Sequence, residues 1–78
     1  MCGIAYVSKL TPKNLDAFHV LCYEMQSRGA DSFGITDGYE VWRWDKAFTE
    51  VWYESKDILY YLVRRGNRSV LAHTRAAT

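Results

Sequence analysis

The first three residues of the chain, Met1, Cys2 and Gly3, are the ones best suited to do chemistry. Removal of Met1 by an aminopeptidase, which the small side chain of Cys2 allows, would leave Cys2 with both a thiol and a free α-amine. Near neutral pH that amine is partly unprotonated and can accept the thiol proton, so the residue carries its own base. We therefore predict that Cys2 is a nucleophile. The alternative is a structural cysteine at the start of a strand.

Two further segments carry polar residues that belong with such a nucleophile. Residues 28–34 read Arg-Gly-Ala-Asp-Ser-Phe-Gly, and residues 73–78 read His-Thr-Arg-Ala-Ala-Thr. Together with the Met-Cys-Gly-Ile start, they resemble class II glutamine amidotransferases, which are N-terminal nucleophile hydrolases. The resemblance is greatest to the glucosamine-6-phosphate synthase branch, which has Arg-Gly-Tyr-Asp-Ser-Ala-Gly and His-Thr-Arg-Trp-Ala-Thr in the same order and at about the same separations.

The resemblance implies that Cys2 attacks the side-chain amide of glutamine, forming a γ-glutamyl thioester and releasing ammonia, after which water releases glutamate. It implies that Arg75 binds the α-carboxylate of glutamine, because a guanidinium offers a carboxylate two parallel hydrogen bonds. Thr78 and the backbone of Ala76 would help to seat the substrate, and Arg28 would help to enclose the site. The alternatives are a surface role for Arg75 and a helix C-terminal role for Arg28.

The histidines and the second cysteine are interpreted as structural. We expect His73 to be packed and hydrogen-bonded, because the α-amine is the base in the family; the alternative is that His73 is a general base. His19 lies beside the apolar face of a helical segment, and Cys22 lies on that face, so a buried, inert thiol is expected. No metal or cofactor is predicted, because the sequence shows neither paired histidines nor a cluster of carboxylates that could hold a metal. The other residues of the two segments are expected to shape turns and backbone geometry: Gly29, Asp31, Ser32 and Gly34.

The chain also departs from the family. Ala76 stands where the synthase branch has Trp, and the 78 residues contain neither the Asn-Gly pair of the oxyanion hole nor the Asp that binds the α-amine. Losing one oxyanion donor lowers turnover by about 10²–10³. We therefore interpret residues 1–78 as a single partial domain whose missing half is supplied in cis, by a second chain or by self-association. The alternatives are an inactive module that docks a partner through its aromatic-rich middle, and an N-terminal nucleophile hydrolase that acts on another amide.

Composition narrows the class of protein. The formal charge of +1, with both signs interspersed, gives no argument for binding nucleic acid or an acidic membrane surface. No apolar stretch approaches the roughly 20 residues of a membrane helix. Two cysteines do not suggest a disulfide framework, so a cytoplasmic location with free thiols is expected.

The hydrophobic pattern predicts an α+β fold in which helices cover an antiparallel sheet. The resemblance implies that this is part of a four-layer αββα sandwich. The expected strands are 3–8, 32–36, 39–44 and 69–73, and Asp37-Gly38 is expected to form a two-residue hairpin turn. The expected helices are 11–27, with Thr11 as N-cap, and 56–65, with Ser55 as cap and Gly66 as terminator. Residues 45–54 fit either a helix or a strand. The first helix is expected to bury Leu15, Phe18, Leu21, Cys22 and Met25, and the second Ile58, Leu59, Leu62 and Val63.

Overall fold

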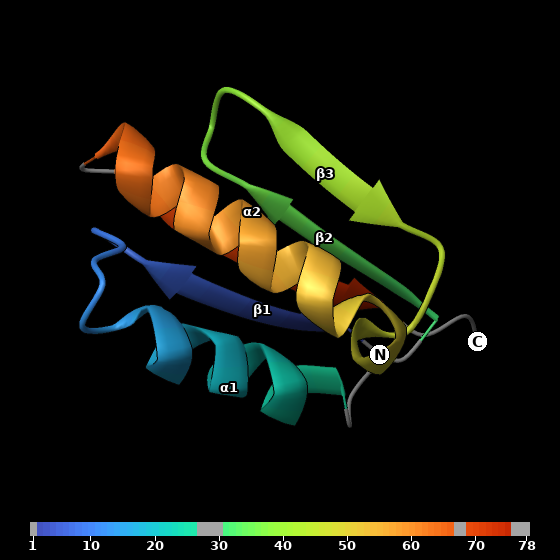
Figure 1. The fold of residues 1–78 in the computed structure, drawn as a ribbon. Helices are drawn as coiled ribbons and strands as arrows, with labels where there is room; N and C mark the ends of the chain where they lie inside the picture. The colour runs from blue at the N-terminus through green and yellow to red at the C-terminus, as the bar shows by residue number, and fades with distance from the viewer. Residues whose placement is uncertain (1, 27–30, 67–68, 76–78) are drawn as a thin grey trace.

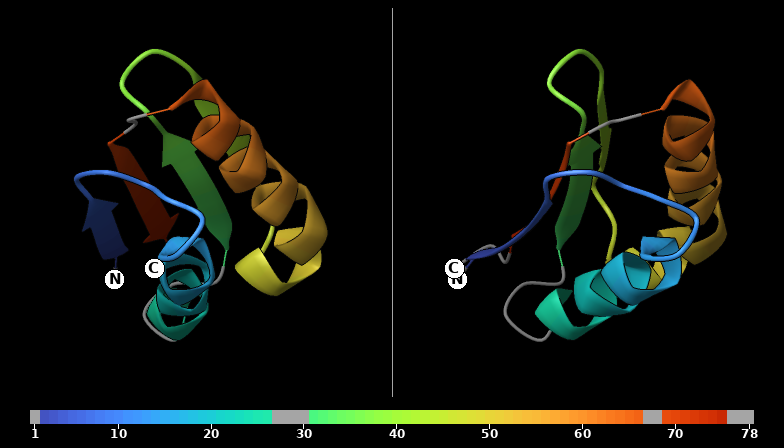
Figure 2. Two further views of the ribbon diagram at one scale, coloured as in Figure 1. Left: turned by 60° about the vertical axis from the view of Figure 1, so that its left-hand side comes forward. Right: turned by 90° about the vertical axis from the view of Figure 1, so that its left-hand side faces the viewer.

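The computed structural model describes residues 2–26, 31–66 and 69–75, which form a sheet layer and a helix layer (Figure 1). The sheet consists of β1 (Cys2–Val7), β2 (Ser32–Thr36), β3 (Val41–Trp44) and β4 (Val70–Arg75), all antiparallel, in the order β1-β4-β2-β3. The helices α1 (Leu15–Met25) and α2 (Trp52–Arg65) lie on the same side of the sheet (Figure 2), and the short 3₁₀ helix η2 (Phe48–Val51) leads into α2. The α+β prediction is confirmed.

The two faces of the sheet differ in what covers them. Side chains alternate between the faces along each strand, and the buried members Ala5, Phe33, Ile35 and Ala72 lie toward the helices. On the other face Ile4 and Tyr6 are 67% and 60% exposed. None of the described elements covers that second face (Figure 2).

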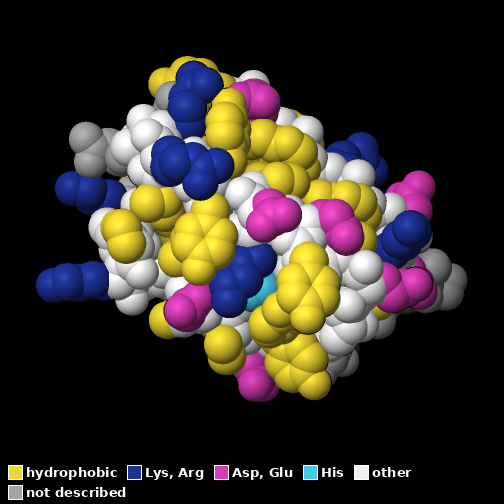
Figure 3. Space-filling view, in the orientation of Figure 1, with side chains coloured by type: hydrophobic (Ala, Val, Ile, Leu, Met, Phe, Trp, Pro, Cys, Tyr) yellow, Lys and Arg dark blue, Asp and Glu magenta, His cyan; other side chains and the backbone are white. Residues whose placement is uncertain are grey.

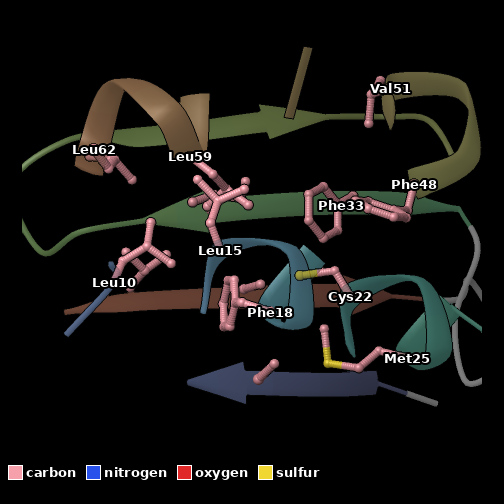
Figure 4. Packing of buried hydrophobic residues seen from close by; sticks show 14 residues of the cluster. Leu10, Leu15, Phe18, Cys22, Met25, Phe33, Phe48, Val51, Leu59 and Leu62 are labelled. Atoms are coloured by element: carbon pink, nitrogen blue, oxygen red, sulfur yellow. The ribbon is translucent and has the colours of Figure 1, made fainter. Parts of the chain in front are cut away.

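One apolar cluster fills the space between the sheet and the helices (Figure 4). Phe33 of β2 and Phe48 of η2 meet edge to face, with ring centroids 4.7 Å apart. Burial of this apolar area is the main favourable term in the folding of a chain this small. The helical members of the cluster are Leu15, Phe18, Cys22, Met25, Phe48, Val51, Leu59 and Leu62.

The first helix begins later than predicted, because residues 11–14 form a capping turn of their own. The Asn14 N–H donates to Thr11 Oγ1 (3.2 Å), and the Thr11 N–H donates to Asn14 Oδ1 (2.8 Å). The prediction that Leu21 is buried is wrong, since it is 46% exposed, and His19 is buried instead. At about 100° per residue, Leu21 lies roughly a quarter turn from the centre of the Leu15–Cys22 face.

The second helix begins earlier than predicted. It starts at Trp52, so Ser55 lies inside the helix and is buried rather than acting as its cap. The undecided segment 45–54 is helical from Phe48 onward, because this conformation buries both Phe48 and Val51. Gly66 ends the helix as predicted: its φ of +79° suits a residue without a side chain.

The β2–β3 connection is a four-residue loop, so the predicted two-residue turn is wrong. The last strand pair is Thr36 with Val41. Asp37 Oδ1 accepts hydrogen bonds from the backbone N–H groups of Tyr39 (2.9 Å) and Glu40 (2.8 Å), which holds the loop closed. Strand β3 therefore starts two residues later than expected.

The helix-covered side of the molecule carries apolar side chains interspersed with charged ones of both signs (Figure 3). Among the described residues, no helix has the length and hydrophobicity needed to span a membrane.

Candidate functional site

The sheet brings the three motifs to one place. Strand β4 lies between β1 and β2, and its last residue, Arg75, pairs with Cys2 of β1 on one side and with Ser32 of β2 on the other. Paired residues of antiparallel strands have Cα atoms about 4.5–5.5 Å apart. The nucleophile predicted at the start of the chain and the arginine predicted to bind a carboxylate are therefore direct cross-strand neighbours.

Arg75 is the site residue that the structure describes most fully. It is exposed on the sheet face away from the helices, where a ligand can reach it. Its carbonyl accepts a hydrogen bond from the backbone N–H of Asp31 (2.8 Å), which continues the β2–β4 pairing by one residue. This places Asp31 and Ser32 at the start of β2, where they were expected to lead into the strand. The side chain of Cys2, and the whole of Arg28, Ala76 and Thr78, lie outside the described residues, as does Gly29.

Behind the Cys2–Arg75 pair, the sheet is fixed to the end of α1. A Cβ atom added to Gly3 would lie 2.9 Å from Thr74 Oγ1, closer than real Cβ contacts allow, and 3.2 Å from Met25 Cβ, tighter than most of them. The buried hydroxyl of Thr74 donates to the carbonyl of Met25 (3.3 Å). Gly3 and Thr74 thus hold the backbone next to Cys2 and Arg75, a positioning role that sequence reasoning missed. A glycine inside an apolar strand was the available signal.

His73 lies on the same face of β4 as Arg75, two residues away. It is half-buried and pairs with Ile4 of β1 and Gly34 of β2. The prediction that it is packed and hydrogen-bonded stays a prediction.

His19 and Ser55 form a polar pair in the core. The Ser55 hydroxyl donates to the Trp52 carbonyl (3.0 Å), so the contact between His19 Nε2 and Ser55 Oγ (3.1 Å) requires the imidazole N–H as donor. Burial, with a smaller effect from the charge of Lys56, lowers the pKa of His19 from 6.5 to about 4. Both side chains are buried. A neutral, buried histidine of this kind is structural, as predicted. Its serine partner is also buried and is inaccessible to substrate.

Cys22 is buried in the core, as predicted. Burial raises the pKa of its thiol to about 12. Because the thiolate is the reactive form, Cys22 is inert near neutral pH.

In the aromatic-rich middle of the chain, two strand tryptophans pack inward, whereas Tyr39 and Tyr53 are exposed. Trp42 and Trp44 are half-buried on the helix-covered face of β3. Trp42 lies 6.2 Å from the ring of Tyr61, and Trp44 stacks on Phe33 at 5.9 Å, measured between ring centroids. These tryptophans therefore serve the core, which weighs against a module that docks partners through them.

The uncovered sheet face is hollowed around Gly34. The hollow has a volume of about 300 Å³ and is lined by residues of β2, β3 and β4, Arg75 and His73 included. Within residues 2–26, 31–66 and 69–75, no group of three or more histidine, cysteine, aspartate or glutamate side chains is arranged to hold a metal ion.

Comparison of the chain with protein-family models, with curated proteins and with solved structures finds no match.

Proposed function

We propose that this chain carries the nucleophile-bearing part of a glutaminase site of the class II amidotransferase type. In this proposal Cys2 attacks the side-chain amide of glutamine, and Arg75 binds the α-carboxylate. The observation that supports it is the cross-strand pairing of Cys2 with Arg75. Adjacent strands lie about 4.8 Å apart, a spacing comparable with the reach of an extended glutamine from its carboxylate to its amide.

The proposed reaction has two steps. The thiol proton passes to the α-amine of Cys2, and the sulfur forms a bond to the amide carbon while the carbon–nitrogen bond breaks. The proton leaves with the nitrogen as ammonia. Water then attacks the γ-glutamyl thioester, which releases glutamate and restores the thiol. The guanidinium of Arg75 takes no part in these proton transfers; it fixes the substrate so that the amide lies at the sulfur.

The proposal includes a partner that completes the fold. Four apolar side chains are exposed on the sheet face away from the helices: Ile4, Tyr6, Val41 and Leu71. These apolar side chains lie among Arg43, His73 and Arg75 on the uncovered face. Exposed apolar surface on a sheet is typical of a face that another layer covers. A second sheet from another chain or a second copy would make the four-layer αββα sandwich. The missing oxyanion donors would come from another chain, because a second copy of these 78 residues also lacks the Asn-Gly pair. A cytoplasmic setting, where thiols stay reduced, goes with this chemistry.

The test is chemical labelling of the full chain with a diazo-ketone analogue of glutamine, followed by intact mass and peptide mass measurement. We expect Met1 to be absent, the adduct to lie on Cys2 and not on Cys22, and excess glutamine to protect against labelling. Arg75→Lys should slow labelling at least tenfold, because an ammonium cannot make the two parallel hydrogen bonds. The matched control is Arg64→Lys, on the exposed surface of α2, which should label at the wild-type rate.

Three results would count against the proposal: a retained Met1, labelling of Cys2 that glutamine does not reduce, or equal rates for Arg75→Lys and wild type. A folded protein that takes no label in any assembly would favour the inactive binding module instead. Labelling that reaches Cys2 but ignores Arg75 would favour a hydrolase of another amide.

A further inference from the structure

The hollow on the uncovered sheet face exists because Gly34 has no side chain. Gly34 sits in the middle of β2 and pairs with Arg43 on β3 and with His73 on β4. A Cβ built on Gly34 would meet only Trp42 O at 3.4 Å and Arg43 Cγ at 3.6 Å, so the surrounding side chains do not fill the space. The result is a recess of about 300 Å³, at the lower end of the range for small-molecule pockets.

The residues that line the hollow change from polar and cationic to mainly apolar along the strands. At one end, Arg75 of β4 pairs with Ser32 of β2, and the middle row holds His73 and Arg43 on either side of Gly34. At the other end, the row consists of Leu71, Thr36 and Val41. Among the described residues that line the hollow, two carry a guanidinium and none carries a carboxylate. The hollow therefore has a cationic, hydrogen-bonding end and a mainly apolar end.

We propose that this hollow binds a small molecule with a carboxylate at one end and a short hydrocarbon chain at the other. The carboxylate lies between Arg43 and Arg75, where guanidinium groups offer paired hydrogen bonds. The hydrocarbon lies over Gly34 and against Leu71 and Val41, whose exposed apolar surface it covers. Arg75 is shared with the glutamine site proposed above, whereas Arg43 and the recess at Gly34 are not. Substitutions at Arg43 and Gly34 therefore test this site independently of Cys2.

A second copy of the chain fits the hollow less well. Two copies packed face to face would bring two sets of Arg43 and Arg75 against each other, and like charges brought together in this way are unfavourable. A carboxylate ligand neutralises the same groups. The charge of the lining thus favours an anionic occupant over a second copy, so of the two partners proposed above for this face a different chain is the one compatible with this site.

The experiment is a titration of the ¹⁵N-labelled 78-residue chain with hexanoate, followed through the amide resonances. We expect saturable shifts for residues of β2, β3 and β4 around Gly34. Arg43→Gln should weaken binding about tenfold or more, because hydrogen bonds to a charged group are lost. Gly34→Val should weaken it at least as much by filling the recess, while a β-branched residue suits a strand. The matched control, Arg64→Gln on α2, should bind as wild type does.

Two further probes define the ligand class. Hexan-1-ol, which lacks the charge, and inorganic phosphate, which lacks the chain, should each bind at least tenfold more weakly than hexanoate. The proposal is overturned if hexanoate gives no saturable shifts, if hexan-1-ol or phosphate binds equally well, or if folded Gly34→Val binds unchanged. If Gly34→Val does not fold, Arg43→Gln decides, and unchanged affinity there overturns the proposal.

Discussion

Lowering the pH from 7.5 to 5.0 should destabilise the folded protein through His19. The imidazole is buried against Phe48 and Trp52, with ring centroids 4.9 and 4.2 Å away. Its pKa falls from 6.5 in a solvated chain to about 4 in the fold. The unfolded state therefore binds a proton in this range and the folded state does not, so stability is greatest above pH 6.5 and falls as the pH drops toward 4.

The size of the effect follows from those two values. Full protonation of the unfolded state against a neutral folded state changes the free energy of unfolding by about 1.4 kcal/mol per pH unit. The change from pH 7.5 to 5.0 spans most of the interval between the two pKa values. The free energy of unfolding therefore falls by about 2 kcal/mol from this residue alone. A protein of this size has only a few kcal/mol of stability, so the loss is readily measured.

The assay is urea unfolding at both pH values, followed by tryptophan fluorescence, which the packed Trp52 should report. His19→Gln is the control, because glutamine keeps a donor for Ser55 but does not titrate. Wild type minus His19→Gln isolates this residue from carboxylates that also begin to protonate at pH 5.0. A variant that loses as much stability as wild type between the two pH values would refute the assignment to His19.

Three other substitutions or treatments have defined outcomes. Gly3→Ala should lower the free energy of unfolding by about 1–3 kcal/mol, because the new methyl overlaps Thr74 Oγ1. Gly34→Ala is the control: its Cβ makes ordinary contacts, so the free energy of unfolding should change by less than about 1 kcal/mol. Equal losses for the two variants in urea unfolding would contradict this prediction. Iodoacetamide at pH 7.5 should leave Cys22 unmodified in folded protein and modify it in urea, as peptide mass would show. Leu59→Ala, at a fully buried position on α2, should cost about 2–5 kcal/mol, and a loss under 1 kcal/mol in urea unfolding would mean that α2 is loosely packed.

Several elements could be read from short stretches of sequence. Strand 32–36 has the predicted bounds and buries Phe33 and Ile35, as its alternation indicated. Gly66 ends α2 because a glycine adopts a positive φ wherever the chain requires it. Burial of Cys22 followed from helical periodicity. Each of these features depends on residues that lie close together in the sequence, so the local sequence is enough to predict it.

The burial of His19 in place of Leu21 shows what the local sequence could not predict. Periodicity ranks residues by hydrophobicity on a helix, but it does not show where the sheet and α2 will lie. In the fold, Ser55 of α2 offers the imidazole a buried hydrogen-bonding partner, which makes burial of His19 favourable. Ser55 itself is buried because the helix starts at Trp52, where η2 has already packed Phe48 and Val51 into the core.

The sequence by itself was enough to single out Cys2, Arg75 and the glycine-containing segment 28–34 as candidate site residues. It was also enough to predict the α+β pattern of elements. Only the tertiary structure decided that β4 is inserted between β1 and β2, which makes Cys2 and Arg75 neighbours and opens a recess at Gly34. The physical reason is that strand pairing joins backbone groups far apart in the chain. The choice of partner strands depends on how all four strands and both helices bury their apolar faces together.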